Sequence, residues 1–167
     1  MEAIMILIVE DTQLVARVLT AQIGREIPDA LVSCVADGEN AFKALTGEEY
    51  EEFDPPSNSV NKREKTPFVA AIWDNTFPVK KGSPAEKDTG LRTVEALKTS
   101  EKVDKGILTR FISHSSDDPE HLIKSKNYVR VFEKPMSKSQ IKEVGLMYQQ
   151  WCGPNNQERK RSKSANT

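Results

Sequence analysis

The sequence predicts an α/β domain in which a doubly wound, five-stranded parallel sheet is covered by helices on both faces. Five runs of apolar residues have the length of strands, and the first, residues 3–9, is apolar throughout, as is typical of a strand buried on both faces. A segment with apolar residues at helical spacing follows each run except the third, where a polar segment intervenes. Helices that alternate with strands must bury their apolar stripes on the sheet, which favours right-handed crossovers and parallel strands.

The first half of the chain contains three of these strands. After residues 3–9, apolar residues at helical spacing predict a helix that ends near Gly24. Residues 30–36 form the second predicted strand, and Asp37 and Gly38 form a turn before a short helix. Residues 68–73 form the third strand, which stops at Asp74.

The second half continues the alternation. Residues 90–98 predict a helix, residues 106–112 a fourth strand, and Asp118 followed by Pro119 the start of the next helix. Residues 129–132 form a short fifth strand. Ser137 and Gln140 have the spacing of a capping box and begin a last helix that ends near Trp151.

Two polar segments interrupt this pattern. Residues 46–67 are rich in charge and proline, and residues 79–89 contain Gly82 and Pro84, so we expect both to be mobile insertions and the first to tolerate shortening. We therefore predict one domain over residues 1–152. Residues 153–167 contain one apolar residue, Ala165, and we expect them to form a disordered basic tail.

The composition excludes several classes of function. The 167 residues carry 24 Lys and Arg against 25 Asp and Glu, and this balance gives no general attraction to nucleic acid. No run is long enough to span a membrane, and the start lacks the pattern of a signal peptide. Cys34 and Cys152 have no metal-ligand spacing and are too few for a disulfide scaffold. We expect a soluble cytoplasmic protein that binds neither membranes nor nucleic acid.

Polar residues follow the predicted strands at the end where ligands bind in such folds. Parallel strands end at one edge of the sheet, so the residues at these ends are expected to lie close together there: Glu10, Asp11, Asp74, Ser113 and Lys134. Crowded carboxylates repel one another unless a cation neutralises them, and Mg²⁺ prefers oxygen ligands of this kind. A carboxylate beside Mg²⁺ can act as a nucleophile toward a phosphoryl group, while a lysine stabilises charge on the transferred oxygens.

Four segments resemble the signature blocks of response-regulator receiver domains, in the same order and in the same strand context. They are residues 6–11 (ILIVED), residues 73–78 (WDNTFP) with Gly90 and Leu91, Ile112 with Ser113, and residues 132–135 (FEKP). The resemblance covers about residues 3–151 and implies the receiver type of flavodoxin-like fold.

The resemblance also implies roles for individual residues. Asp74 corresponds to the phosphoacceptor, Ser113 to the switch hydroxyl and Lys134 to the lysine that contacts the phosphoryl group. The metal set implied for Mg²⁺ is Glu10, Asp11, Asp74 and Thr76. The family's Lys-Pro bond is commonly cis, which would fit Lys134 and Pro135.

Three features depart from the family pattern. Gly90 follows Asp74 by sixteen residues, about twice the usual spacing, so residues 79–89 enlarge the loop beside the site. His114 stands where a small residue is usual after the switch hydroxyl, and Val131 stands where an aromatic residue is usual. We interpret His114 and His121 as packing or surface residues, because neither has a partner at metal-ligand spacing.

The function that these residues favour is that of a stand-alone response regulator in a phosphorelay. Such a protein would take a phosphoryl group from a histidine kinase or phosphotransfer protein and signal by contact with a downstream protein. About 16 residues follow Trp151, too few for an output domain. The alternative is a receiver-like scaffold that works without phosphorylation. A Mg²⁺-dependent phosphohydrolase ranks last, because Thr76 stands where a second acid would be needed.

Overall fold

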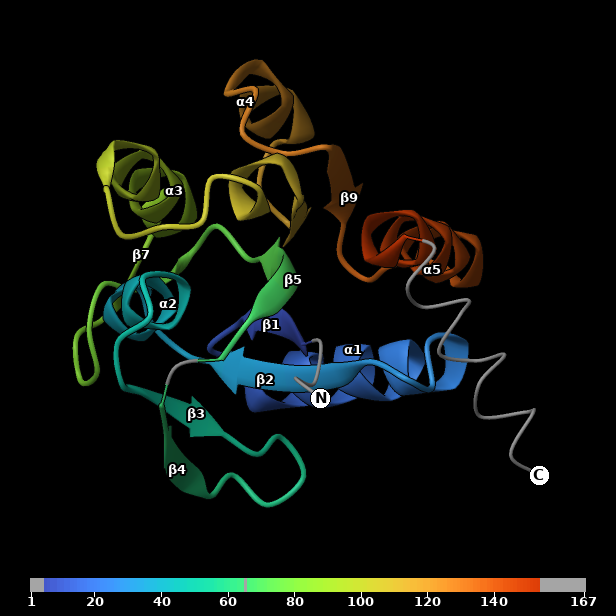
Figure 1. The fold of residues 1–167 in the computed structure, drawn as a ribbon. Coiled ribbons are helices and arrows are strands. Elements are labelled where there is room, and N and C mark those ends of the chain that lie inside the picture. The colour runs from blue at the N-terminus through green and yellow to red at the C-terminus, as the bar shows by residue number, and fades with distance from the viewer. Residues whose placement is uncertain (1–4, 65, 154–167) are drawn as a thin grey trace.

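The computed structural model describes residues 5–64 and 66–153, and a seven-stranded sheet lies at its centre (Figure 1). The strand order is β4-β3-β2-β1-β5-β8-β9. The last five of these are parallel, as predicted: β2 (Leu31–Val35), β1 (Met5–Val9), β5 (Phe68–Trp73), β8 (Phe111–Ser115) and β9 (Arg130–Glu133).

Helices cover both faces of the sheet and divide the core in two. Strand side chains alternate between faces, so Ile6 and Ile8 pack with α1 (Gln13–Glu26) and α5 (Lys138–Cys152), while Leu7 and Val9 pack with α2 (Gly38–Leu45) and α3 (Thr89–Thr99). A short helix, α4 (Pro119–Lys124), lies beside β9. The α/β class and the doubly wound arrangement are therefore confirmed.

The ends of the helices follow local chemistry. Asp37 caps α2 by accepting a hydrogen bond from the Asn40 backbone N–H, and Ser137 and Gln140 form the predicted capping box of α5. The predicted stop of the first helix at Gly24 is wrong, because α1 continues to Glu26. No atom lies within 4 Å of the Gly24 Cβ position, and the helix buries Ile23 just before it.

The predicted strand at residues 106–112 is also wrong in its boundaries. A 3₁₀ helix, η1 (Ile107–Thr109), takes up its first part, because the Asp104 side chain and carbonyl accept hydrogen bonds from the two residues at its start. Ile107 is buried in the core instead of pairing with a strand. The strand β8 begins at Phe111 and runs through Ser115, three residues past the predicted end.

The first polar insertion contains a β-hairpin where the sequence predicts a loop. Strands β3 (Tyr50–Phe53) and β4 (Val60–Arg63) pair with each other, and Phe53 pairs with Cys34 at the edge of β2. Tyr50 is 2% exposed, and its hydroxyl lies 3.0 Å from Ser33 Oγ. These two buried aromatic residues attach the hairpin to the core, so the sheet has two more strands than predicted.

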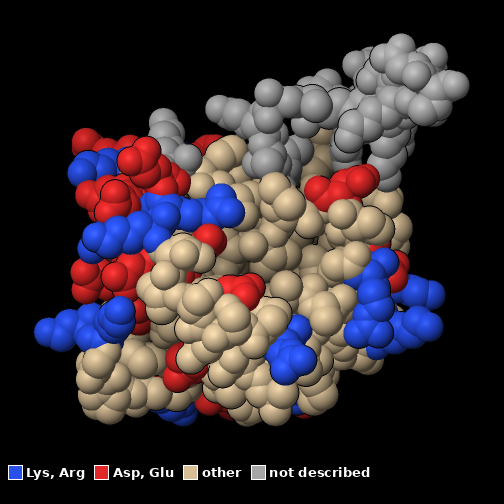
Figure 2. All heavy atoms as spheres, turned by 90° about the horizontal axis from the view of Figure 1, so that it is seen from below, with Lys and Arg blue, Asp and Glu red and all other residues tan. Residues whose placement is uncertain are grey.

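Charged side chains support the hairpin from the solvent side. Arg63 pairs with Glu52 at 2.7 Å across the two strands, and Lys62 lies 3.9 Å from Glu49. In the view from below, acidic and basic side chains mix along the left side of the molecule, while most of the middle of that face is uncharged (Figure 2). The charged first part of the insertion therefore forms a strand, β3, that pairs with a neighbouring strand on each side.

The second insertion contains a short antiparallel ladder between β6 (Phe77–Pro78) and β7 (Ala85–Glu86). It is tied to its neighbours, because Lys81 pairs with Glu51 of the hairpin at 3.1 Å and the Val79 carbonyl accepts a hydrogen bond from the Glu39 N–H. The two insertions therefore contact each other beside α2. The predicted basic tail at residues 153–167 lies outside the described residues beyond Gly153.

No helix within residues 5–64 and 66–153 is long and apolar enough to cross a membrane.

Candidate phosphoacceptor and metal site

The carboxyl ends of β1 and β5 bring three acidic residues together. Val9 and Trp73 are paired in the sheet, and the Asp74 N–H donates to the Val9 carbonyl at 2.9 Å. Glu10 and Asp74, which follow these paired residues, are therefore neighbours at one edge of the sheet. This is the juxtaposition that the sequence predicts.

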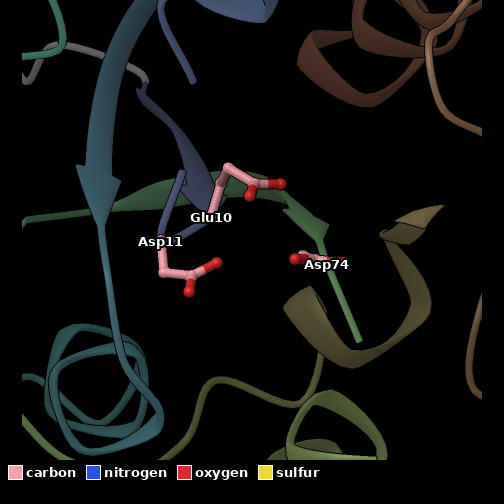
Figure 3. A group of neighbouring side chains, drawn as sticks. All are labelled: Glu10, Asp11 and Asp74. Atoms are coloured by element: carbon pink, nitrogen blue, oxygen red, sulfur yellow. The ribbon is translucent and has the colours of Figure 1, made fainter. Parts of the chain in front are cut away.

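The three carboxylates face a common space (Figure 3). One carboxylate oxygen each from Glu10, Asp11 and Asp74 lies within 4.8 Å of the other two. Glu10 and Asp74 are buried, and Asp11 is the more exposed member of the group. Three hard oxygen ligands at this spacing, open to solvent on the Asp11 side, suit a divalent cation such as Mg²⁺ that keeps part of its water shell.

Lys134 completes the site from the end of β9. Its Nζ lies 2.6 Å from Glu10 Oε2 and 3.1 Å from Asp74 Oδ2, so it contacts two of the three carboxylates. Burial alone would lower the pKa of Lys134, but the bond to Glu10 and the charge of Asp74 outweigh it, and the pKa is raised. The peptide bond between Lys134 and Pro135 is cis.

The electrostatics of the site favour a bound cation. Burial raises the pKa of Glu10 to about 7, with the charge of Asp74 adding to the effect and Lys134 opposing it. Burial also raises the pKa of Asp74 and of Asp11. One ammonium group therefore does not neutralise three crowded carboxylates, and the remaining negative charge stabilises an added cation.

The backbone around Asp74 is tightly packed. Asp74 Oδ1 accepts a hydrogen bond of 2.7 Å from the Asn75 N–H, which fixes the orientation of the carboxylate. Gly90, at the start of α3, lies directly against this turn, and a Cβ there would be 2.5 Å from the Asp74 carbonyl oxygen. Only glycine allows α3 to approach this closely.

Thr76 lies two residues beyond Asp74, and its side chain points to an acid that the sequence pattern did not single out. Thr76 Oγ1 donates to Asp117 Oδ2 at 2.9 Å, and Asn75 Nδ2 donates to the same oxygen at 2.7 Å. Asn75 and Asp117 are 42 residues apart, and no local motif connects them. The available signal was the position of Asp117 just after a strand, which the misplaced end of β8 concealed.

The structure differs from the sequence-based prediction at the candidate switch hydroxyl. Ser113 lies in the middle of β8, in register with Trp73 and Val131, and its buried Oγ has no hydrogen-bond partner among the described residues. Ser115 is the last residue of β8, and its Oγ accepts a hydrogen bond of 3.0 Å from the Asp117 N–H. The prediction that Ser113 ends the strand is wrong, and Ser115 is a second candidate for the switch hydroxyl.

The two histidines are packing and surface residues, as predicted. His114 is 4% exposed and lies between Ser113 and Ser115 in β8. His121 is largely exposed on α4, where its Nε2 lies 3.0 Å from Asp88 Oδ1.

Several solved structures with a similar fold are response regulators or receiver domains. The Mn²⁺-bound form of the response regulator Rcp1 is 19% identical, with a TM-score of 0.56 over 84% of this chain and 88% of that chain. The receiver domain of a Pseudomonas aeruginosa sensor histidine kinase, with a magnesium ion in its active-site cleft, is 20% identical, with a TM-score of 0.58 over 89% and 97%. The phosphorylated cyanobacterial phytochrome response regulator RcpA is 18% identical, with a TM-score of 0.57 over 90% and 94%.

Comparison of the sequence with family profiles and with curated proteins gives no match. At the identities of the solved structures the likeness is one of fold, and the chain has the fold of these domains.

Proposed function

We propose that this chain, which has the fold of response-regulator receiver domains, accepts a phosphoryl group on Asp74 in a Mg²⁺-dependent phosphorelay. One observation carries the proposal: the carboxylates of Glu10, Asp11 and Asp74 converge within 4.8 Å, and Lys134 contacts two of them. A site that only stabilised the fold would not require three acids in one place, because each buried carboxylate costs desolvation energy.

The transfer itself is a displacement at phosphorus. An oxygen of the Asp74 carboxylate forms the new bond to phosphorus while the bond between phosphorus and the donor breaks, and the leaving group keeps the electron pair of that bond. Asp74 Oδ1 is held by the Asn75 N–H, so Oδ2, now paired with Lys134, is the oxygen that can be released for attack.

Lys134 and the acidic pair have separate tasks in this scheme. Lys134 moves from the Asp74 carboxylate to the transferred oxygens, where its ammonium group offsets their charge. Glu10, Asp11, Asp74 and Thr76 would hold Mg²⁺, which when bound supplies charge stabilisation for the transferred group. The raised pKa of Glu10, about 7, accords with a site that is complete only with its cation.

The donor that fits this chemistry is a histidine kinase or a histidine phosphotransfer protein, and the output is a contact with a downstream protein. Phosphorylation adds charge and acceptor oxygens beside β8, and a hydroxyl of that strand can donate to them only after transfer. Ser113 and Ser115 both project to the same face of the sheet as Trp73, since β8 alternates. Ser115 has the better place, at the strand end.

The test of the proposed function is direct phosphorylation. We expect the protein, incubated with Mg²⁺ and acetyl phosphate or phosphoramidate, to gain the mass of one phosphoryl group, and we expect chelation of Mg²⁺ to prevent the gain. Asp74→Asn should abolish it. Asp104→Asn, an exposed acid at the start of η1, is the matched control and should be labelled like the parent.

Two outcomes would contradict the proposal. Equal labelling of Asp74→Asn would place the acceptor elsewhere. An unlabelled parent protein that still binds its partners would favour the phosphorylation-independent scaffold.

A further inference from the structure

Two carboxylates outside the metal group are bound to the segment that follows Asp74. Asn75 is completely buried, and its Nδ2 donates to Asp88 Oδ1 at 2.9 Å and to Asp117 Oδ2 at 2.7 Å. Its Oδ1 accepts a bond of 3.3 Å from the Leu91 N–H. Asn75 therefore ties the turn after β5 to two other segments of the chain.

Asp117 is the centre of this network on the β8 side. One of its oxygens, Oδ2, accepts from both Asn75 and Thr76, and its own N–H donates to Ser115 Oγ. Asp117 directly precedes Asp118, which caps α4 by accepting a hydrogen bond from the Glu120 N–H. One carboxylate thus connects the candidate metal-binding turn to the first turn of α4.

A second contact reaches the same helix. His121 on α4 lies 3.0 Å from Asp88 Oδ1, the oxygen that also accepts from Asn75. Asp88 has a left-handed backbone conformation, with φ of 65°, just before α3. The helix α4 has only six residues, with Leu122 as its buried side chain and Ile123 60% exposed. Few of its side chains are buried, and these polar links connect it to the segment that follows Asp74.

We propose that Asp117 is a positioning residue for the metal site, acting through the Thr76 hydroxyl, and that this link transmits metal binding to α4. The inference rests on the proposed function and goes beyond it, because neither the metal set nor the switch hydroxyl includes Asp117.

The physical reason is that two interactions, one with the bound cation and one with Asp117, constrain the position of Thr76. The resemblance to receiver domains implies that Thr76 belongs to the metal set, and its side chain is hydrogen-bonded to an anion on another segment. A bond to a carboxylate is stronger than one between neutral groups. A small movement of the turn toward a bound cation must therefore pull Asp117 along or lose the bond, and either result changes the start of α4. A cation can shift α4 only through such a state-dependent contact.

The decisive comparison is Thr76→Val against Thr76→Ser. Valine has the shape of threonine without the hydroxyl, whereas serine keeps the hydroxyl, so the pair separates the hydrogen bond from packing. We expect Thr76→Val to weaken Mg²⁺ binding, measured by calorimetry, by about three- to tenfold, which is less than the full loss of a hydrogen bond to a carboxylate because the hydroxyl acts on the cation only through the position of the turn. We expect Thr76→Ser to stay within about twofold of the parent, since the hydroxyl that makes this bond is kept.

The second readout follows α4 itself. We expect Mg²⁺ to change amide hydrogen exchange over residues 118–126 in the parent and in Thr76→Ser, and to change it less in Thr76→Val, where the links through Asn75 remain. A double-mutant cycle with Asp117→Ala should show that the two substitutions are not additive in Mg²⁺ affinity. Glu120→Gln removes one negative charge from the same helix without touching Thr76, and it controls for the general effect of charge.

The possible results separate the role of Asp117 from the proposed phosphorylation of Asp74. If Thr76→Val binds Mg²⁺ as tightly as Thr76→Ser and α4 responds as strongly in both, the positioning role of Asp117 is wrong, while phosphorylation of Asp74 stands. If Asp117→Ala and Glu120→Gln weaken binding equally, the effect is one of charge and the inference fails. If the parent neither binds Mg²⁺ nor accepts a phosphoryl group, both the inference and the proposed function fail.

Discussion

Replacing His114 with leucine should remove a large part of the acid sensitivity of this fold. His114 is 4% exposed in the central part of the sheet, and its Nε2 has no partner among the described residues. Burial, with the nearby charge of Lys134, lowers the pKa of His114 to about 4, from an ordinary value of 6.5. The ring is therefore neutral in the folded protein at pH values where it is charged in the unfolded chain.

The sign of the effect follows from proton binding. Below pH 6.5 the unfolded chain binds a proton at His114 and the folded protein does not, so the free energy of unfolding falls as the pH falls toward 4. Below pH 4 the folded protein binds the proton too, and this contribution stops changing. Because the pKa of His114 falls from 6.5 to about 4 on folding, the free energy of unfolding is about 2–3 kcal/mol lower at about pH 4.5 than at about pH 7.5.

The assay is urea unfolding, followed by the fluorescence of Trp73 and Trp151, which both pack in the core, at a series of pH values between about 7.5 and 4.5. The carboxylates contribute in both proteins, so the difference between the parent and His114→Leu isolates the histidine. We expect the parent to lose about 2–3 kcal/mol more than the variant over this range, as the His114 shift requires. Parallel pH curves for the two proteins, or a His114 ring that titrates near pH 6.5 by NMR, would refute the reasoning.

Three further predictions concern packing and reactivity. Tyr50→Ala should lower the free energy of unfolding by about 3–5 kcal/mol in urea titrations, because the side chain is buried, and a loss near zero would mean that the hairpin is dispensable. Gly90→Ala should lower the melting temperature, because its Cβ would lie 2.5 Å from the Asp74 carbonyl oxygen. Gly24→Ala, in open space on α1, should raise the melting temperature, because alanine has a higher helix propensity than glycine. The opposite order of the two melting temperatures would contradict this reasoning. Cys34 should resist thiol reagents until the protein is unfolded, because burial raises its pKa to about 12, and rapid labelling of native Cys34, located by peptide mass, would show that it is accessible.

The inner strands and the acidic residues at their ends were predictable from the sequence for a simple reason. Apolar runs that are buried on both faces stop where the chain leaves the sheet, and the first polar residue marks the end. Glu10, Asp11 and Asp74 follow this rule, and the structure places them together. Lys134 does not follow it, because β9 is largely exposed and ends in the polar residue Glu133; the resemblance to receiver domains identified this lysine.

The rule fails where polar residues are buried inside a strand. Ser113, His114 and Ser115 are all buried in β8, so the strand has no apolar signal beyond Ile112 and was predicted to end too early. The side-chain network around Asp117 could not be predicted either, because it joins segments 42 residues apart whose contact depends on that strand end.

The hairpin was missed because its apolar residues are too sparse for a pattern. Tyr50 and Phe53 are three residues apart, which is not the period of a strand, and the two residues between them are glutamates. A hairpin added outside the core needs few buried side chains, and Tyr50 and Phe53 are the buried ones in β3. Pairing with β2 and β4 holds the strand in the sheet, and the hydrophobic pattern of the sequence gives no sign of this pairing.

The hairpin also indicates how a fold of this kind can gain length. Because β3 and β4 are added outside β2, the registers of β2 with β1 and of β1 with β5 need no adjustment to admit them. The arrangement of the acidic site therefore depends little on an insertion at the sheet edge. Such an insertion can change in sequence and length while the acids after β1 and β5 stay in place. Its outermost strand carries Lys62 and Arg63, and such cations discourage pairing of the open edge with another chain. Adding strands at this edge therefore enlarges the surface of the domain, and the cations of the outermost strand oppose aggregation through that edge.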